Sequence, residues 1–252
     1  MQRELHTLVY RPRSWIARVE LIGVVTLFGL VLGSLLYATQ GVREAALERS
    51  CIGNLHGIRI ALRTYQDQYG TLPPACLHDP DGRPLHSWRV LILPQLGHLD
   101  LYRRYHFDEP WNSVHNLRVA GEMPDDYRCQ VEKEELKSDT SYVAVVGQGT
   151  VWSDASAKRI ATDDHRIAIV EVAHSNILWT EPRDLAIESV DTLVHRTTSS
   201  LVTHHERGPR FASLEHLIIL SRAAPRDPES KLLRELLTDG MAFSRLQEDW
   251  IH

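Results

Sequence analysis

The chain has 252 residues, with 28 lysines and arginines against 33 aspartates and glutamates, and a formal net charge of -5. Its length suits one main globular body with an appendage. No run of Lys and Arg is long enough to line a binding surface, so we expect no nucleic-acid partner. Hydrophobic residues make up an ordinary 43% of the chain but are unevenly distributed, and this uneven distribution is informative.

The first predicted element is an uncharged apolar run, Leu21 to Ala38. Eighteen residues of helix at about 1.5 Å per residue span roughly 27 Å, close to the roughly 30 Å of a bilayer's hydrocarbon core. A cleaved signal peptide and a buried core helix are the two alternatives, and both fit less well. The sequence therefore predicts a transmembrane helix over 20–40. Gly29 and Gly33 have the small-xxx-small spacing that lets another helix pack closely.

The charges on either side of this run predict its orientation. The leader, residues 1–19, contains four arginines, whereas the twenty residues after Ala38 contain only Arg43 and Arg49. By the positive-inside rule the leader is cytoplasmic and the rest of the chain is exported. We expect a single-pass protein of the inner (cytoplasmic) membrane, with the bilayer as its first partner. Glu20 stands immediately before the apolar run.

The helix is predicted to continue past the membrane over 41–69. No helix breaker occurs between Ala38 and Gly70, which gives one helix from about Glu20 to Tyr69, roughly 75 Å long at 1.5 Å per residue. In its second half apolar residues recur at steps of three and four, the stripe of an amphipathic helix. They are Ile52, Leu55, Ile58, Leu62, Tyr65 and Tyr69.

Residues 70–252 read as an exported α+β head. Asp81-Gly82 predicts a turn, and the stretch after it predicts a short helix limited by Pro94. Runs rich in Val and Ile predict strands, and Asp227-Pro228-Glu229 announces a C-terminal helix. The expected strands are 141–152, 166–173 and 176–185, and 131–140 is expected to be a charged surface connection.

Candidate chemical sites in the sequence are few. His204-His205-Glu206 is the densest histidine cluster, but no metal-binding spacing surrounds it. Asp79 to Gly82 lacks the later acidic ligands of a calcium loop, and Gly147-Gln148-Gly149 lacks the rest of a dinucleotide loop. An acid/base set could be drawn from four charged residues, although a salt-bridge network at strand ends explains them better. They are Glu171, Glu181, Arg183 and Asp184.

We therefore expect no catalytic residue, no metal and no cofactor, and the sequence does not support naming an enzyme. The large aromatic residues of the head are expected to be core rather than a ligand platform. They are Trp88, Trp111, Trp152 and Trp179. In an oxidising compartment, three cysteines (Cys51, Cys76 and Cys129) predict one disulfide and one remaining thiol, with buried free thiols as the alternative.

Several pieces of the chain resemble type IV pilins and pseudopilins, and more narrowly a bacterial family of pseudopilin-like proteins whose head is a domain of unknown function. The pieces run in the family's order from residue 42 to 185. They are VREAALERSCIGNLHGIRIALRTYQDQYGTLPPA, DGRPLHSWRVLILPQL, LYRRYHFDEPWNS, YRC, TSYVAVVG and WTEPRDL. The resemblance implies a pilin-like fold, a long N-terminal helix packed on an antiparallel sheet. It also implies Cys51 and Cys129 as the first choice for the disulfide.

Two features depart from the family. In prepilins a glycine precedes the cut and a glutamate follows it; here Trp15 stands in place of the glycine, Ile16 would be the new terminus, and Glu20 is the glutamate. The family's late hairpin is also eroded, to HHERGPRFASLEHLIILS. In filaments of this kind the glutamate neutralises a neighbour's freed ammonium. Without cleavage, Glu20 is instead an interfacial residue near Arg18 or lipid headgroups.

The sequence supports three functional hypotheses. The first is a non-catalytic envelope protein of pseudopilin type that assembles with pilin-like or type II secretion subunits. The second is a membrane-tethered periplasmic head that is not processed and binds a ligand or partner. The third and weakest is an envelope enzyme with an unrecognised site.

Overall fold

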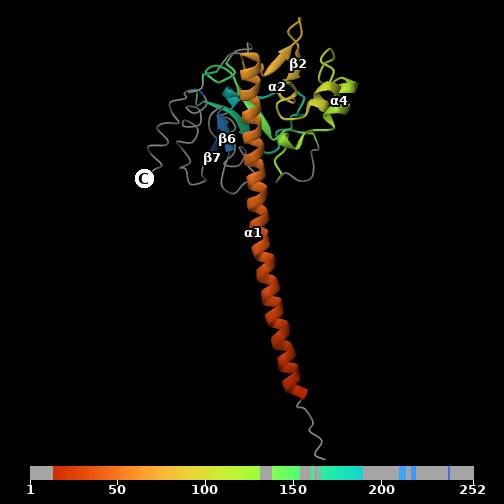
Figure 1. Ribbon diagram of the computed structural model, residues 1–252, viewed down its shortest axis with the longest axis vertical. Helices are drawn as coiled ribbons and strands as arrows, with labels where there is room; N and C mark the ends of the chain where they lie inside the picture. Colours follow the sequence, from red (N-terminus) through yellow and green to blue (C-terminus); the bar gives the residue numbers. More distant parts are fainter. Residues whose placement is uncertain are drawn as a thin grey trace, which may run out of the picture. The chain divides into compact units, whose positions relative to one another are not determined.

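The computed structural model describes residues 14–130, 138–153, 160–161, 164, 166–189, 210–213, 217–219 and 238. The chain divides into two compact units, Met1–Ala46 and Leu47–His252. One element, helix α1 (Ser14–Tyr69), contributes to both units and is the red to orange helix of Figure 1. The long N-terminal helix that the sequence predicts is therefore confirmed, and it begins six residues before Glu20.

In the first unit α1 is an apolar helix with no buried side. Its large hydrophobic side chains between Val19 and Val42 are all exposed, with fractions from 46% at Leu32 to 81% at Tyr37. A helix that is apolar all round suits a membrane or the core of a large protein. One helix of the described chain is long and apolar enough to cross a membrane, and its apolar window is not buried.

In the second unit α1 buries one stripe of side chains. Leu55, Ile58 and Leu62 are fully buried and lie in the core cluster of the head. Tyr69, predicted to share this stripe, is exposed instead. The helix ends because Gly70 adopts φ +82°, a left-handed conformation that favours glycine, and its N–H donates to Gln66 O at 2.7 Å. The two prolines that follow, Pro73 and Pro74, do not continue the helix.

The next segments form a hairpin and short helices. Strands β1 (Cys76–His78) and β2 (Pro84–Ser87) pair antiparallel, and the Asp79 side chain closes their turn by accepting from Asp81 N and Arg83 N. This confirms the predicted turn. The short helices are α2 (Trp88–Leu91), α3 (Leu99–Arg104), α4 (Val114–Ala120) and the 3-10 turn η1 (Asp125–Tyr127).

The main sheet has five strands in the order β5-β3-β4-β6-β7. Strands β3, β4, β6 and β7 pair antiparallel, as the resemblance implies, whereas β3 and β5 pair parallel, so the five-stranded sheet is mixed. Almost every side chain of β3 and β4 is buried, which means that both faces of the sheet are covered. The strands are β3 (Tyr142–Val146), β4 (Ile167–Glu171), β5 (Leu185–Ala186), β6 (Arg210–Ser213) and β7 (Leu217–Ile219).

The strand predictions meet mixed outcomes. Strands β3 and β4 lie inside the predicted 141–152 and 166–173. The predicted strand 176–185 is wrong, because only a single bridge at Leu178 and the first residue of β5 fall within it. The eroded stretch after His204 still contributes the antiparallel pair β6–β7. The predicted C-terminal helix, His204-His205-Glu206 and most of the connection 131–140 lie outside the described residues.

Aromatic side chains fill the core of the head. Trp88, Trp152 and Trp179 are buried, as expected, whereas Trp111 is half-buried. The ring of Trp88 stacks on Trp152 at 6.0 Å between centroids, and Tyr127 stacks on Trp179 at 5.8 Å. The indole N–H groups of Trp152 and Trp179 donate to backbone carbonyls, so these aromatic residues bury no unpaired donor.

Candidate functional site

The apolar surface of α1 is the first candidate site. Two of its hydroxyl groups bond back to the helix: Thr26 Oγ1 donates to Ile22 O at 2.7 Å and Ser34 Oγ to Val31 O at 2.8 Å. A side chain that satisfies its own donor in this way suits a helix in lipid, where no water is available. This surface can therefore lie in hydrocarbon without an unpaired hydroxyl donor on those two side chains.

The assembly and packing candidates lie on this exposed part of the helix. Glu20 and Trp15 are exposed. A Cβ added at Gly29 or Gly33 meets no heavy atom within 4 Å among the described residues. Both positions therefore keep space for a helix from another chain, and the roles predicted for Glu20, Gly29 and Gly33 stay predictions.

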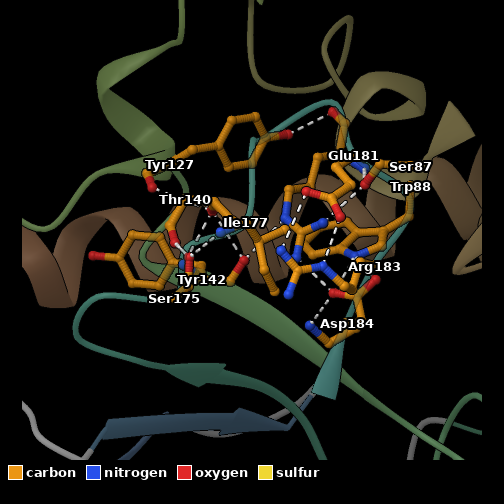
Figure 2. Close-up of polar contacts among 12 residues, drawn as sticks. Ser87, Trp88, Tyr127, Thr140, Tyr142, Ser175, Ile177, Glu181, Arg183 and Asp184 are labelled. Carbon is orange, nitrogen blue, oxygen red and sulfur yellow. Dashed lines mark hydrogen bonds and ion pairs between the residues drawn. The ribbon is translucent and has the colours of Figure 1, made fainter. Parts of the chain in front are cut away.

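A buried ion pair between Arg89 and Asp184 stabilises the centre of the head, and Figure 2 shows Asp184 together with Trp88 and Tyr142. Arg89 Nη2 and Asp184 Oδ1 lie 2.5 Å apart, and both side chains are almost completely buried. The guanidinium also donates to Tyr142 O at 3.0 Å and to Ser87 Oγ at 2.9 Å. The pair thus ties the start of α2 to β3 and to the residue before β5.

The Asp184 carboxylate collects two further donors. Ala144 N on β3 donates to it at 2.8 Å, and the Trp88 indole N–H lies 3.2 Å from both carboxylate oxygens. Burial raises the pKa of the Asp184 carboxyl, while the Arg89 guanidinium and these N–H donors oppose that rise. The network therefore links α2, β3 and the residue before β5 through one buried carboxylate.

The four charged residues from which an acid/base set could be drawn do not share one ion-pair network. Glu181 pairs with Arg183 at 2.6 Å near the surface, and Asp184 pairs with Arg89. Glu171, at the end of β4, is buried beside two cysteines instead. Glu181, Arg183 and Asp184 do take part in ion pairs, but in two separate pairs, and only Asp184 adjoins a strand, β5.

Cys51, Cys129 and Glu171 form a buried cluster. Cys51 Sγ and Cys129 Sγ lie 2.8 Å apart, and a carboxylate oxygen of Glu171 lies within 4.8 Å of both sulfurs. Cys76 is half-buried on β1 and is not part of the cluster. The structure thus brings together the pair that the resemblance singles out. Glu171 is the member that sequence reasoning assigned to a different set.

A surface pocket lies between α3 and α4. The rings of His106 and His115 stack in parallel with their centroids 3.5 Å apart, and Arg104 pairs with Glu122 through two contacts of 2.7 and 2.6 Å. His115 Nε2 donates to Arg104 O at 2.7 Å. The charges of Arg104 and Glu122 are thus paired with each other. It is lined by Arg104, His106, His115, Arg118, Val119 and Glu122.

Two polar residues that dock α1 in the head carried no prediction. Asn54 Nδ2 donates to Asp125 O and Arg128 O at 2.9 Å each. Gln66 Nε2 donates to Ile160 O at 2.9 Å, and Ile160 N donates to Gln66 Oε1 at 2.7 Å. Asn54 and Gln66 each lie next to a residue of the apolar stripe. A polar residue in such a position is a sequence signal for a side chain that hydrogen-bonds to buried backbone groups.

Comparison with known proteins gives one family. The model of a family described as protein of unknown function (DUF1559) matches residues 40–167. No curated protein and no solved structure matches the chain. The matched region covers the end of the apolar surface, the docked part of α1 and the head as far as the start of β4. Because it spans just over half of the 252 residues, the chain belongs to this family of unknown function.

Proposed function

We propose that the protein is a non-catalytic, single-pass envelope protein of pseudopilin type that acts by assembly with pilin-like or secretion subunits. The observation that carries the proposal is the continuity of α1 from an exposed apolar surface into a segment that is docked in a folded head. Such a helix joins a surface suited to lipid and the folded head within one element of the chain. A subunit that assembles through its membrane helix needs a connection of this kind to its head.

The membrane part of the proposal rests on the exposed surface between Val19 and Val42. So large an apolar area is rare on a soluble monomer and marks contact with lipid or another protein. The hydroxyl groups of Thr26 and Ser34 are already paired within the helix. The arginine bias of the leader favours an exported head and an inner-membrane location.

The assembly part of the proposal rests on Gly29 and Gly33. They are four residues apart and therefore lie on one face of α1, with open space where a side chain would stand. Helices in membranes associate through such faces, because close backbone approach maximises van der Waals contact. A second α1 or a related helix fits this face.

The non-catalytic part is supported by how polar groups are used in the described head. The buried charges Arg89 and Asp184 bond each other and the main chain, and the buried amide of Asn116 bonds carbonyls around His106. These groups hold loops and strands of the head in place.

Cross-linking in native membranes tests the assembly. Membranes that contain the full chain are treated with an amine-reactive cross-linker and the products are sized. We expect cross-linked species in the wild type and a clear reduction in the Gly29→Leu/Gly33→Leu variant. Gly23→Leu is the matched control, since Gly23 lies on another face and also has open space around it. Unchanged cross-linking in the double variant contradicts the proposal.

The departure at Trp15 favours the second function, a tethered periplasmic head that is not processed. Mass spectrometry of the N-terminus of the membrane-purified protein separates the two. A terminus at Ile16 supports pseudopilin-type processing, with Glu20 free to pair with a neighbour's ammonium. An intact Met1 excludes that mechanism and leaves the tethered head.

A further inference from the structure

The cluster of Cys51, Cys129 and Glu171 has no part in the proposed assembly. Cys51 lies on the docked part of α1, and Cys129 follows η1. Both side chains are fully buried, and 78 sequence positions separate them. The 2.8 Å between the sulfurs is a direct contact, so the two side chains point at each other.

The backbone on both sides of this contact is held by other interactions. Cys129 N donates to Ser141 Oγ at 2.8 Å, and the Tyr142 hydroxyl donates to Cys51 O at 3.1 Å. Asn54, one helical turn after Cys51, donates to Arg128 O, directly before Cys129. The sulfurs are therefore brought together by the fold and not by a chance choice of rotamers.

Two kinds of chemistry fit two such cysteines beside a carboxylate, a metal site and a disulfide. Two thiolates on a tetrahedral zinc stand roughly 3.8 Å apart, because each Zn–S bond is about 2.3 Å. The observed 2.8 Å is about 1 Å too short for that, and a zinc site also needs a fourth ligand or water. A disulfide bond of about 2.05 Å needs the sulfurs to move closer by less than 1 Å.

The electrostatics of the cluster also favour a neutral product. The hydrogen bond with Cys51 and burial both raise the pKa of the Cys129 thiol, and the nearby Glu171 adds to this rise. A metal would require thiolates in this place, whereas a disulfide carries no charge. Buried thiols of this kind are also shielded from exchange after folding.

We propose that Cys51 and Cys129 are joined by a structural disulfide that fastens helix α1 to the segment leading into β3, and that Cys76 stays a thiol. The oxidant is a disulfide compound such as oxidised glutathione. One protein thiolate attacks it and releases the first glutathione thiol; the second protein thiolate attacks the mixed disulfide, forms the Cys51–Cys129 bond and releases the second. Two electrons and two protons pass from the protein to glutathione.

In the cell, formation of this bond rests on the proposed export of the head to an oxidising compartment. The chemistry itself is testable without that assumption. The full chain is purified in detergent, reduced, unfolded and refolded in a glutathione redox buffer, and its accessible thiols are then alkylated in denaturant. We expect one of three cysteines to be alkylated, and all three after reduction, with a peptide that links Cys51 to Cys129.

Three variants sharpen the result. Cys76→Ser should oxidise fully and leave no thiol, whereas Cys51→Ser should leave two. Glu171→Gln should keep the disulfide, because the carboxylate is not needed for the bond. Three alkylated thiols in the refolded wild type, or a linkage through Cys76, would overturn the proposal. One equivalent of bound zinc that is lost in Glu171→Gln would overturn it in favour of a metal site.

Protein taken directly from membranes separates this proposal from the proposed export. A linked Cys51–Cys129 pair there supports both. A reduced pair in protein from membranes, together with a linked pair after refolding in glutathione, contradicts export and keeps the disulfide.

Discussion

Two stretches of helix α1 are rich in apolar residues and differ in what surrounds them. Between Val19 and Val42 every large apolar side chain is exposed, while Leu55, Ile58 and Leu62 are fully buried. The first stretch is apolar on all sides, and the second has one apolar stripe between polar positions. An all-round apolar helix is suited to lipid and a striped one to a protein core. The distribution of apolar residues, rather than their number, distinguishes the two.

The second stretch also differs in how its polar groups are used. Thr26 and Ser34 bond to their own helix, whereas Asn54 and Gln66 bond to backbone of distant segments. A polar side chain in lipid must be satisfied locally, but one at a protein interface gives the contact its position. The comparison predicts that substitutions in the two stretches fail in different ways.

The largest effect is expected from charges in the first stretch. Leu27→Arg/Val31→Arg places two arginines near the centre of the apolar run, and each costs about 2.5 to 3.5 kcal/mol of insertion free energy. We expect the variant to lose most of its membrane association in a carbonate wash. Ile60→Arg/Thr64→Arg, on the exposed side of the docked stretch, is the control and should sediment like the wild type. Equal membrane association of the two variants after the carbonate wash would contradict the distinction between the two stretches of α1.

The next effect concerns the core of the head. Asp184→Ala leaves the Arg89 charge buried without its partner, and such changes cost about 3 to 5 kcal/mol of unfolding free energy. Glu181→Ala, which removes the more exposed ion pair with Arg183, should cost about 1 kcal/mol or less. Urea unfolding followed by tryptophan fluorescence measures both. Similar costs for the two variants would show that Arg89 and Asp184 do not organise the core.

A smaller effect tests the docking of α1. Gln66→Ala leaves the N–H and C=O of Ile160 without partners, which costs about 1 to 3 kcal/mol for a buried backbone group. Asp67→Ala, at the neighbouring exposed position, should be nearly neutral. The unfolding midpoints of the two variants provide the comparison. If Asp67→Ala destabilises the head as much as Gln66→Ala, the docking contact is unimportant.

The smallest effect is a dependence on pH. His86 Nε2 donates to Phe107 O at 2.9 Å, so Nδ1 accepts from the Tyr105 hydroxyl at 3.0 Å, and the neutral ring is fully paired. Burial lowers the pKa of His86, although the bond to Phe107 partly opposes this. The unfolded chain therefore binds more protons than the folded one just below the usual histidine pKa of about 6.5.

The contribution of His86 to the free energy of unfolding is consequently complete above about pH 6.5. It is lost as the pH falls from there toward the lower pKa that His86 has in the folded protein. His86→Gln should reduce the difference in urea midpoint between pH 7.5 and pH 5.5. The matched control His78→Gln, at an exposed position, should leave the wild-type difference in place. An unchanged pH dependence in His86→Gln would refute this assignment.

The parts of the fold that follow from local pattern could be predicted from the sequence. The chain has no helix breaker after Ala38 until Gly70 and Pro73, and this predicts that α1 continues to that point. Enrichment in Val and Ile predicts β3 and β4. The expected strand at 176–185 is wrong because its apolar residues lie in a turn instead. Trp179 is buried in this turn, and its indole N–H donates to Ala120 O. Burial in a loop and burial in a strand produce the same apolar run.

The candidate sites depend on contacts that no local pattern encodes. Arg89 and Asp184 are 95 positions apart, and nothing in either neighbourhood marks an arginine as buried. The sequence allows Glu171 to be drawn into one set with Glu181, but in the fold Glu171 lies opposite Tyr142 and beside the two cysteines. Cys51 and Cys129 could be paired in advance only through the resemblance.

The central claim is that α1 crosses the inner membrane with the leader inside and the head outside. The direct test labels intact spheroplasts with a membrane-impermeant maleimide, with the full chain carrying either Gln2→Cys or Asp67→Cys; Asp67 is exposed on the docked part of α1. Above the wild-type background, we predict labelling of Asp67→Cys in intact spheroplasts and of Gln2→Cys only after lysis. Labelling of Gln2→Cys but not Asp67→Cys in intact spheroplasts would contradict the account.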